Sequence, residues 1–195
     1  MKVDRTTVKH WGRWVATFVG FPLAGVAARA MAGDVDAPAA AVLGGLIGGA
    51  VLGITQATIG GVGHGARLRW AGATGVGLAV GLGIGAAAAD YRTDAASLVA
   101  MGAICGVTVG IAQAVSIPLV ALDRALWMLA TPALWAIGWF ITSQVIVDAD
   151  RHHAVFGSSG ALAVSALAGV LVARWRSPMS AALDPAAGSD DRMAA

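Results

Sequence analysis

The chain has 195 residues, of which 57% are hydrophobic and only 12% are charged, and its mean hydropathy is +0.74. A soluble domain is about 25% charged, so these residues cannot build a polar surface around the core, and lipid must cover it. The net charge of +2 comes from basic residues scattered singly between apolar runs. This pattern argues against nucleic-acid binding and carries information on membrane topology instead.

Charged residues divide the chain into six apolar runs, and a helix of about 20 apolar residues crosses a membrane. In chain order the runs are 14–31, 38–62, 70–89, 95–119, 125–147 and 154–173. The sequence therefore predicts an all-α membrane protein whose six transmembrane helices form one domain, 14–176. We expect a cytoplasmic segment, 1–13, before it. The tail, 177–195, is rich in small and polar residues, which predicts disorder.

The first run follows a basic segment, and this combination is also typical of a cleavable signal peptide. The run matches later helices in the repeat described below, so we interpret it as a retained first helix. Pro22 in this run and Pro132 in the fifth run each lack a backbone N–H, which predicts a kink in both helices.

The basic residues also predict the orientation. With the N-terminus inside, ten Lys and Arg residues lie at the inner ends of the runs and three at the outer ends. Because cytoplasmic loops are enriched in Lys and Arg, both termini are expected in the cytoplasm. The excess of Arg over Lys favours a GC-rich bacterial genome, so we expect a multi-pass protein of a bacterial plasma membrane.

Tryptophans mark several run ends. An indole ring favours the membrane interface, and four tryptophans lie at such ends: Trp14, Trp70, Trp127 and Trp175. Trp135 and Trp139 lie deep in the fifth run instead. We expect these two side chains to face lipid or a neighbouring helix, where they would be available to a partner.

An internal repeat with an offset of 57 residues runs through the chain. Three glycines and a glutamine of the second run, Gly45, Gly49, Gly53 and Gln56, align with Gly102, Gly106, Gly110 and Gln113. Without a gap the alignment continues over the next runs, from Arg67, Trp70, Thr74 and Gly81 to Arg124, Trp127, Thr131 and Gly138. Matches of Gln, Arg, Trp and Thr in one register are not expected by chance.

The same offset takes Thr74 back to Thr17, so the first helix is a third copy of the second half of the unit. In the sixth run the match weakens, because Leu167 aligns with the third glycine and Val170 with the glutamine. The chain thus predicts three pseudo-repeated helical hairpins, the third formed by helices 6 and 1. Since each copy has two spans, the pseudo-threefold axis would follow the membrane normal.

Glycines four residues apart lie on one face of a helix, and small residues let membrane helices approach closely. We therefore expect the repeated glycines, including Gly81 and Gly138, to face the interior. Gln56 is expected to bond Thr74, and Gln113 to bond Thr131, across each hairpin or to the next unit, with Thr17 completing the layer. These groups are either ties between helices or the lining of a path for a small solute or ion.

The outer loops carry pairs of aspartates, and oxygen ligands of this kind bind hard cations. A cation site would use Asp34, Asp36, Asp90, Asp94, Asp148 and Asp150, although solvated loops explain the same residues. Adjacent His152 and His153 seldom chelate one metal without further ligands. No catalytic or phosphate-binding motif is present, so we expect no cofactor and no enzymatic activity.

The segments 45–81 and 102–138 share a motif of spaced glycines and Gln-Ala, a turn, and then Arg-x2-Trp-x2-Ala-Thr. This motif resembles small uncharacterised bacterial polytopic membrane proteins. In those proteins a Gln-Trp pair is common, whereas Ala57 and Ala114 follow the glutamines here. The resemblance supports the repeat and implies no activity.

Three functions remain open. The leading hypothesis is a non-enzymatic accessory or scaffolding subunit of a larger inner-membrane complex, in contact with membrane lipids and other membrane subunits. The alternative is a small channel or carrier that uses the glutamine and threonine layer. An enzyme acting on lipid at the interface would have only Asp148, Asp150, His152 and His153 to work with.

Overall fold

The computed structural model describes residues 5–145 and 154–183, and regular structure in this part of the chain is entirely helical. The elements in chain order are α1 (Arg5–Val15), η1 (Ala16–Val19), α2 (Gly20–Ala32), α3 (Pro38–Ile59), η2 (His64–Ala66), α4 (Arg67–Ala88), α5 (Ala95–Ser116), α6 (Ala121–Ser143) and α7 (Ser158–Leu183). Six helical segments are long and apolar enough to cross a membrane, and the first of these is the whole stretch from α1 to α2. The prediction of six apolar helices is confirmed.

The first and last helices are longer than the apolar runs suggested. The helix in the first run begins at Arg5 rather than at residue 14, and α7 continues to Leu183. The tail predicted to be disordered thus overlaps the end of this helix at 177–183, while 184–195 lie outside the described residues. The charged residues of α1 do not end the helix. One face of α1 packs on α7, and the charged side chains point to water.

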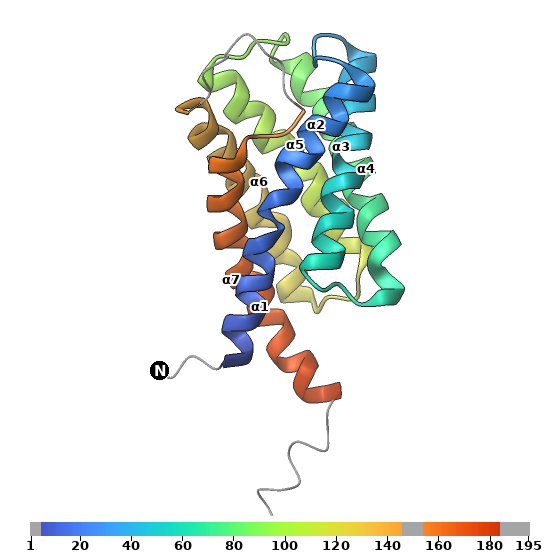
Figure 1. Ribbon diagram of the computed structural model, residues 1–195, viewed down its shortest axis with the longest axis vertical. Helices are drawn as coiled ribbons and strands as arrows, with labels where there is room; N and C mark the ends of the chain where they lie inside the picture. The colour runs from blue at the N-terminus through green and yellow to red at the C-terminus, as the bar shows by residue number, and fades with distance from the viewer. Residues whose placement is uncertain (1–4, 146–153, 184–195) are drawn as a thin grey trace, which may run out of the picture.

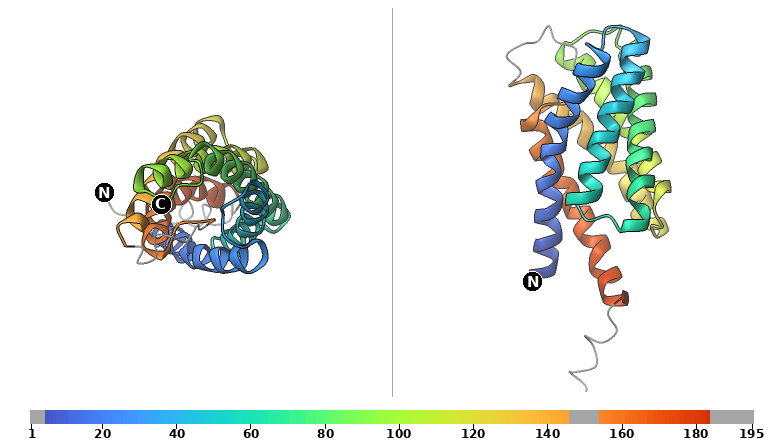
Figure 2. Two further views of the ribbon diagram at one scale, coloured as in Figure 1. Left: turned by 90° about the horizontal axis from the view of Figure 1, so that it is seen from above. Right: turned by 45° about the vertical axis from the view of Figure 1, so that its right-hand side comes forward.

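The helices form a closed ring (Figures 1 and 2). Each consecutive pair from α2 to α7 is in contact, and α1 packs against α7, so the first and last helices close the ring. The loops 60–66 and 117–120, the start of α1 and the end of α7 lie at the lower end in Figure 1. The opposite, upper end holds the loops between α2 and α3 and between α4 and α5.

Glycines bring consecutive helices close together. A Cβ atom on Gly49 of α3 would lie 2.6 Å from the carbonyl oxygen of Thr74 in α4, and one on Gly106 of α5 would lie 2.6 Å from Cα of Pro132 in α6. No real Cβ fits at such distances, so these helices approach backbone to backbone. The same holds, against α4 or α6, for Gly45, Gly53 and Gly102, whereas a Cβ on Gly110 would lie 3.0 Å from the Thr131 side chain.

Two further predicted packing glycines lie at other interfaces of the ring. A Cβ on Gly81 of α4 would come within 2.7 Å of Cα of Cys105 in α5, and one on Gly138 of α6 within 2.8 Å of the Phe156 ring. Pro22 lies just after η1 in α2, where the helix changes from 3₁₀ to α geometry. Pro132 lies inside α6, which continues past it.

The outer surface of the ring is apolar. Large hydrophobic side chains are exposed on every spanning segment, among them Val26 on α2, Ile54 on α3, Val76 on α4, Val107 on α5, Leu129 on α6 and Val170 on α7. Burial of such surface in water would stabilise an oligomer or an aggregate, whereas in a bilayer the acyl chains cover it. The structure thus has the exterior of a multi-pass membrane protein.

Candidate functional site

The five residues of the predicted polar layer are all buried in the ring. Their exposed fractions do not exceed 7%, and they come from η1, α3, α4, α5 and α6: Thr17, Gln56, Thr74, Gln113 and Thr131. At such depth an unsatisfied polar group costs several kcal/mol. Their hydrogen bonds therefore decide whether the layer is closed or available to a solute.

The two glutamines bond tryptophans of the following helix. Trp70 Nε1 donates to Gln56 Oε1 and Trp127 Nε1 donates to Gln113 Oε1, both at 3.1 Å. The two pairs are related by the 57-residue offset, since both members of each pair align at it. An indole N–H is a donor only and an amide oxygen accepts two bonds, so each pair still leaves the glutamine free to bond a second group.

Gln113 connects the two hairpins. Its Nε2 donates to Gln56 Oε1 at 3.1 Å and to Thr74 Oγ1 at 2.9 Å. Of the two arrangements expected for the glutamine and threonine bonds, the structure contains the one between neighbouring units, with Gln113 reaching Thr74 of the preceding hairpin. Thr131 in its own hairpin is not its hydrogen-bond partner.

Each threonine of the layer donates its hydroxyl to a tryptophan carbonyl oxygen in its own helical segment. Thr74 bonds Trp70 at 2.8 Å and Thr131 bonds Trp127 at 2.6 Å, each four residues back along an α-helix. Thr17 bonds the carbonyl oxygen of Trp14, three residues back, at 2.7 Å. In the first helix, Trp14 therefore has the role that Trp70 has in α4 and Trp127 in α6. The 57-residue offset would instead align Trp70 with Arg13.

The 3₁₀ segment η1 explains this shift by one residue. Three residues of 3₁₀ helix rise about 6 Å and turn once, and four residues of α-helix rise about 6 Å with slightly more than one turn. The first helix can thus have one residue fewer between Trp14 and Thr17 and still hold both side chains at the positions of their counterparts in α4 and α6. An ungapped alignment of the chain with itself does not pair Trp14 with Trp70, whereas an alignment that allows one deletion does.

Of the tryptophans near the run ends, Trp14, Trp70 and Trp127 are buried inside the ring instead of facing a membrane interface, and Trp175 is half-buried. Trp14, Trp70 and Trp127 are at most 3% exposed, and their ring centroids are 5.9–6.1 Å apart with edge-to-face or tilted geometry. Trp175 stacks edge-on against Trp127, 5.0 Å away. Such geometry is favourable for aromatic pairs, and for Trp70 and Trp127 the glutamines satisfy the indole N–H groups.

Trp135 and Trp139 also point inward. They are 5% and 1% exposed and pack with Phe21 and Phe156 in the upper half of the ring, where the Phe21 and Phe156 rings stack 4.5 Å apart. Of the two expectations for these side chains, lipid or a neighbouring helix, the structure shows the second, and within this fold they are not available to a partner. Position along a run indicates depth in the membrane but not the direction of the side chain.

Helix α7 has a different register from the one that the repeat predicted. Leu167 and Val170, aligned with the third glycine and the glutamine, are 50% and 60% exposed. The buried face instead carries Ala161, Ser165, Gly169 and Val172. These residues align with Gly102, Gly106, Gly110 and Gln113 at an offset of 59, so two extra residues precede α7 and valine stands where the other copies have glutamine.

A small internal cavity lies beside the polar layer, on the side of α7 where this glutamine is missing. Its volume is about 20 Å³, and it is lined by Gln56, Gln113, Thr131, Ser165 and several apolar residues that include Trp14 and Trp135. A cavity of this size holds about one water molecule. It does not form an open path, since the aromatic group around Phe21 and Phe156 fills the ring above it.

A much larger cup opens at the lower end of the ring. Its volume is about 460 Å³, and its walls come from α1, the start of α4, α7 and the two lower loops. The apolar lining includes Trp14, Trp70 and Trp175, with Val62, Ile117, Pro118, Leu119 and Val172, and the polar lining consists of His10, His64 and Arg69. Pockets of about 300–1,000 Å³ with apolar walls and few polar groups are typical ligand sites.

Several arginines at the lower end fasten the loops and helices. Arg67 Nε donates to the Val62 carbonyl oxygen at 3.2 Å and Arg124 donates to the Leu119 carbonyl oxygen at 3.3 Å, an equivalent bond in two units. Two more arginines connect separate elements: Arg13 Nε donates to the Ile59 carbonyl oxygen at 3.0 Å and Arg174 pairs with Asp123 at 3.7 Å. These side chains are therefore structural.

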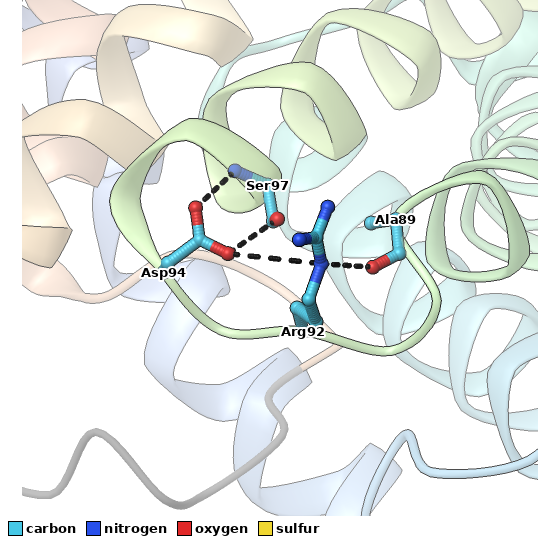
Figure 3. Close-up of polar contacts among 4 residues, drawn as sticks. All are labelled: Ala89, Arg92, Asp94 and Ser97. Carbon is cyan, nitrogen blue, oxygen red and sulfur yellow. Dashed lines mark hydrogen bonds and ion pairs between the residues drawn. The ribbon is translucent and has the colours of Figure 1, made fainter.

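The aspartates of the upper loops make local contacts. Asp34 pairs with Arg29, and Asp94 caps α5 by accepting bonds from the backbone and hydroxyl of Ser97 at 3.0 and 2.6 Å, with Arg92 nearby (Figure 3). The bonds from Ser97 lower the pKa of Asp94, so this cap contributes stability above the ordinary aspartate pKa and loses it as the pH falls through the lowered value.

The predicted cation site is only partly within the described residues. Asp36 and Asp90 lie in exposed loops, whereas Asp148 and Asp150 fall outside the described residues, as do His152 and His153. Among the described side chains no group of three or more His, Cys or Asp residues is placed to hold a metal ion. The six-carboxylate site therefore stays a prediction.

Comparison of the chain with protein-family models, with curated proteins and with solved structures found no match.

Proposed function

We propose that this chain is a non-enzymatic accessory or scaffolding subunit of a larger complex in a bacterial plasma membrane. The observation that carries the proposal is the closed middle of the ring, where Gln56, Gln113 and Thr74 bond one another and two indoles. Polar groups that satisfy each other hold helices together and are not free to strip water from a passing solute. A subunit of this kind acts through contacts between its outer surface and other proteins of the complex.

The proposed architecture is three copies of one helical hairpin around a pseudo-threefold axis. In its support, the bonds of Gln56 to Trp70 and of Gln113 to Trp127 are equivalent, and Thr17 repeats the bond made by Thr74 and Thr131. The third copy would join α7 to the segment from α1 to α2, which is in contact with it. A compact ring of this kind suits a scaffold, because its helices pack closely and it presents six apolar segments to the outside.

The proposed orientation places the lower end in the cytoplasm, with both termini there. Its support is the concentration of arginines in the lower loops and helix ends, including Arg67, Arg69 and Arg124, since basic residues remain on the cytoplasmic side. The lower end would then be the surface that meets cytoplasmic parts of a partner. The tryptophans in the upper half no longer contribute to this proposal, because they are buried.

The test is isolation of the chain at its natural expression level in a mild detergent, followed by native gel analysis and identification of co-purifying subunits. We expect a particle larger than the chain and its detergent belt, with partners in a fixed ratio that a chemical cross-link in intact cells also captures. An isolated chain that cross-links only to itself or to nothing would contradict the proposal. A Leu129→Ala variant, altered on the lipid-facing side of α6, then tests whether this face contributes to the contact.

One observation favours the alternative of a small channel or carrier. Trp14 lines both the internal cavity and the cup, so this residue lies between the two spaces that a path would have to join. In liposomes, a conducting protein should lose flux when Gln56→Leu and Gln113→Leu are combined and gain flux with Trp14→Ala. Flux that neither change affects would remove this alternative.

A further inference from the structure

We infer that the cup at the lower end of the ring binds a single-chain amphiphile with an anionic head group, such as a fatty-acid carboxylate. The inference concerns a ligand, and it stands whether or not the chain proves to be an accessory subunit. It rests on three features of the cup: its shape and lining, its one uncommitted arginine, and the positions at which it departs from the repeat.

The base of the cup is suited to an apolar chain. Three indoles, of Trp14, Trp70 and Trp175, and the side chains of Val62 and Val172 form it, and Trp14 and Trp70 are held in fixed edge-to-face geometry 6.0 Å apart. Each methylene group buried against such walls contributes about 0.8 kcal/mol. A volume of about 460 Å³ is in the range of sites for small ligands rather than for whole helices of a partner.

The polar lining of the cup attracts a negative charge. Arg69 and His64 belong to the lining, and no Asp in the described part of the chain does. The nearest arginines of the repeat, Arg67 and Arg124, are held by loop carbonyl oxygens, whereas Arg69 is exposed and forms no ion pair with any described carboxylate. A guanidinium binds a carboxylate or phosphate group through paired, charge-assisted hydrogen bonds, and Arg69 is free to do so.

Two polar residues of the cup are departures from the repeat. At the 57-residue offset, Leu126 stands in the place of Arg69 and Ala121 in the place of His64. The second hairpin folds with these apolar residues, so neither Arg69 nor His64 is required to build a hairpin. Their presence in one copy only is explained by a ligand that lies against that copy.

The experiment uses the full chain in nanodiscs of phosphatidylcholine, with 9,10-dibromostearate as the probe. Its bromine atoms quench tryptophan fluorescence on contact, and the indoles of the cup report binding directly. We expect saturable quenching that the uncharged methyl ester of the same probe does not produce with comparable affinity. Arg69→Leu, which introduces the residue of the other copy, should weaken binding about tenfold or more, and Arg69→Lys should weaken it less.

Two further variants separate the cup from general partition into the lipid. Gly63 lines the cup, and a Cβ there would meet no atom within 4 Å, so Gly63→Phe should fill the cup and abolish saturable quenching without altering the fold. Lys9→Leu removes an exposed positive charge of α1 outside the cup lining and should leave the affinity within about twofold. Folding of each variant is checked by circular dichroism.

The results that would overturn the inference are distinct. Equal affinities of the wild-type chain, Arg69→Leu and Gly63→Phe would mean that the probe only partitions into the nanodisc. Equal affinities for the acid and its methyl ester would remove the role of the anionic head group. Quenching by dibrominated phosphatidylglycerol in the nanodisc, dependent on Arg69 while dibromostearate has no effect, would assign the cup to a bilayer phospholipid instead.

Discussion

At the scale of single residues, hydrogen bonds between glutamines and tryptophans connect the helices in the interior of this protein. Gln113 uses both ends of its amide, since it accepts from Trp127 and donates to Gln56 and Thr74. Gln56 accepts two bonds with one oxygen atom. The two glutamines of the repeat are therefore not equal in their contribution, and Gln113 is the one that ties two hairpins together.

This difference predicts unequal effects of one substitution. Gln113→Leu removes three hydrogen bonds between helices and leaves the Trp127 N–H without its acceptor, so it should destabilise the bundle by about 1–2 kcal/mol. Gln56→Leu should cost less. Reversible unfolding by SDS in mixed micelles measures both values, and Gln144→Leu is the control, because the Gln144 side chain is exposed and, among the described residues, bonds the adjacent Ser143. Equal stability of all three variants would contradict this account.

The sequence indicated that these polar residues lie in the interior, but it did not indicate their partners. Trp70 and Trp127 were assigned to the membrane interface because an amphipathic ring at the end of a run is usually found there. In this chain a glutamine fourteen residues earlier accepts the indole N–H, which removes the need for an interfacial partner. The recurrence of Gln and Trp at one spacing in both copies was the available signal.

At the scale of elements, the repeat predicted the packing faces of α3 and α5 but not the register of the two terminal copies. One residue is missing between Trp14 and Thr17, and the 3₁₀ segment η1 compensates for it. Two residues are added before α7, which moves its buried face to Ser165 and Val172. Both changes fall where an ungapped comparison has too few distinctive residues to detect them.

The close approach of α3 and α4 predicts a contrast between two identical substitutions. Gly49→Ala would put a methyl group 2.6 Å from the Thr74 carbonyl oxygen, so the helices must separate, at a cost of about 1–3 kcal/mol. Gly72→Ala on the outer face of α4 meets no atom within 4 Å and should leave stability unchanged or slightly raised. Thermal unfolding of both variants in the same detergent measures the difference, and equal melting temperatures would exclude tight packing at Gly49.

At the scale of the whole molecule, hydropathy alone was sufficient to predict six apolar helices, because lipid imposes both their length and their composition. It could not show that the first and last helices lie side by side. That contact became a hypothesis only through the repeat, and in the structure α1 and α7 are in contact, with Trp11 Nε1 donating to the Ala166 carbonyl oxygen at 2.9 Å.

The proposed orientation predicts which loops a membrane-impermeant reagent reaches. In a Cys105→Ala background, Asp36→Cys in an upper loop should react with an impermeant maleimide on intact cells. Gly65→Cys in a lower loop should react only after the membrane is permeabilised. The reverse pattern would contradict the orientation, and reaction of both variants after permeabilisation shows that each cysteine is accessible.

Closure of the ring by its two ends sets the order in which the protein can be assembled. The bond between Trp11 and Ala166 joins residues 155 positions apart, and a ribosome adds 5–20 residues per second, so about 8–30 s separate the synthesis of these two residues. During that interval the first helix resides in the bilayer with the α7-facing side of its lower half exposed to lipid. Biogenesis thus ends with a docking step, in which the last helix displaces lipid from the first.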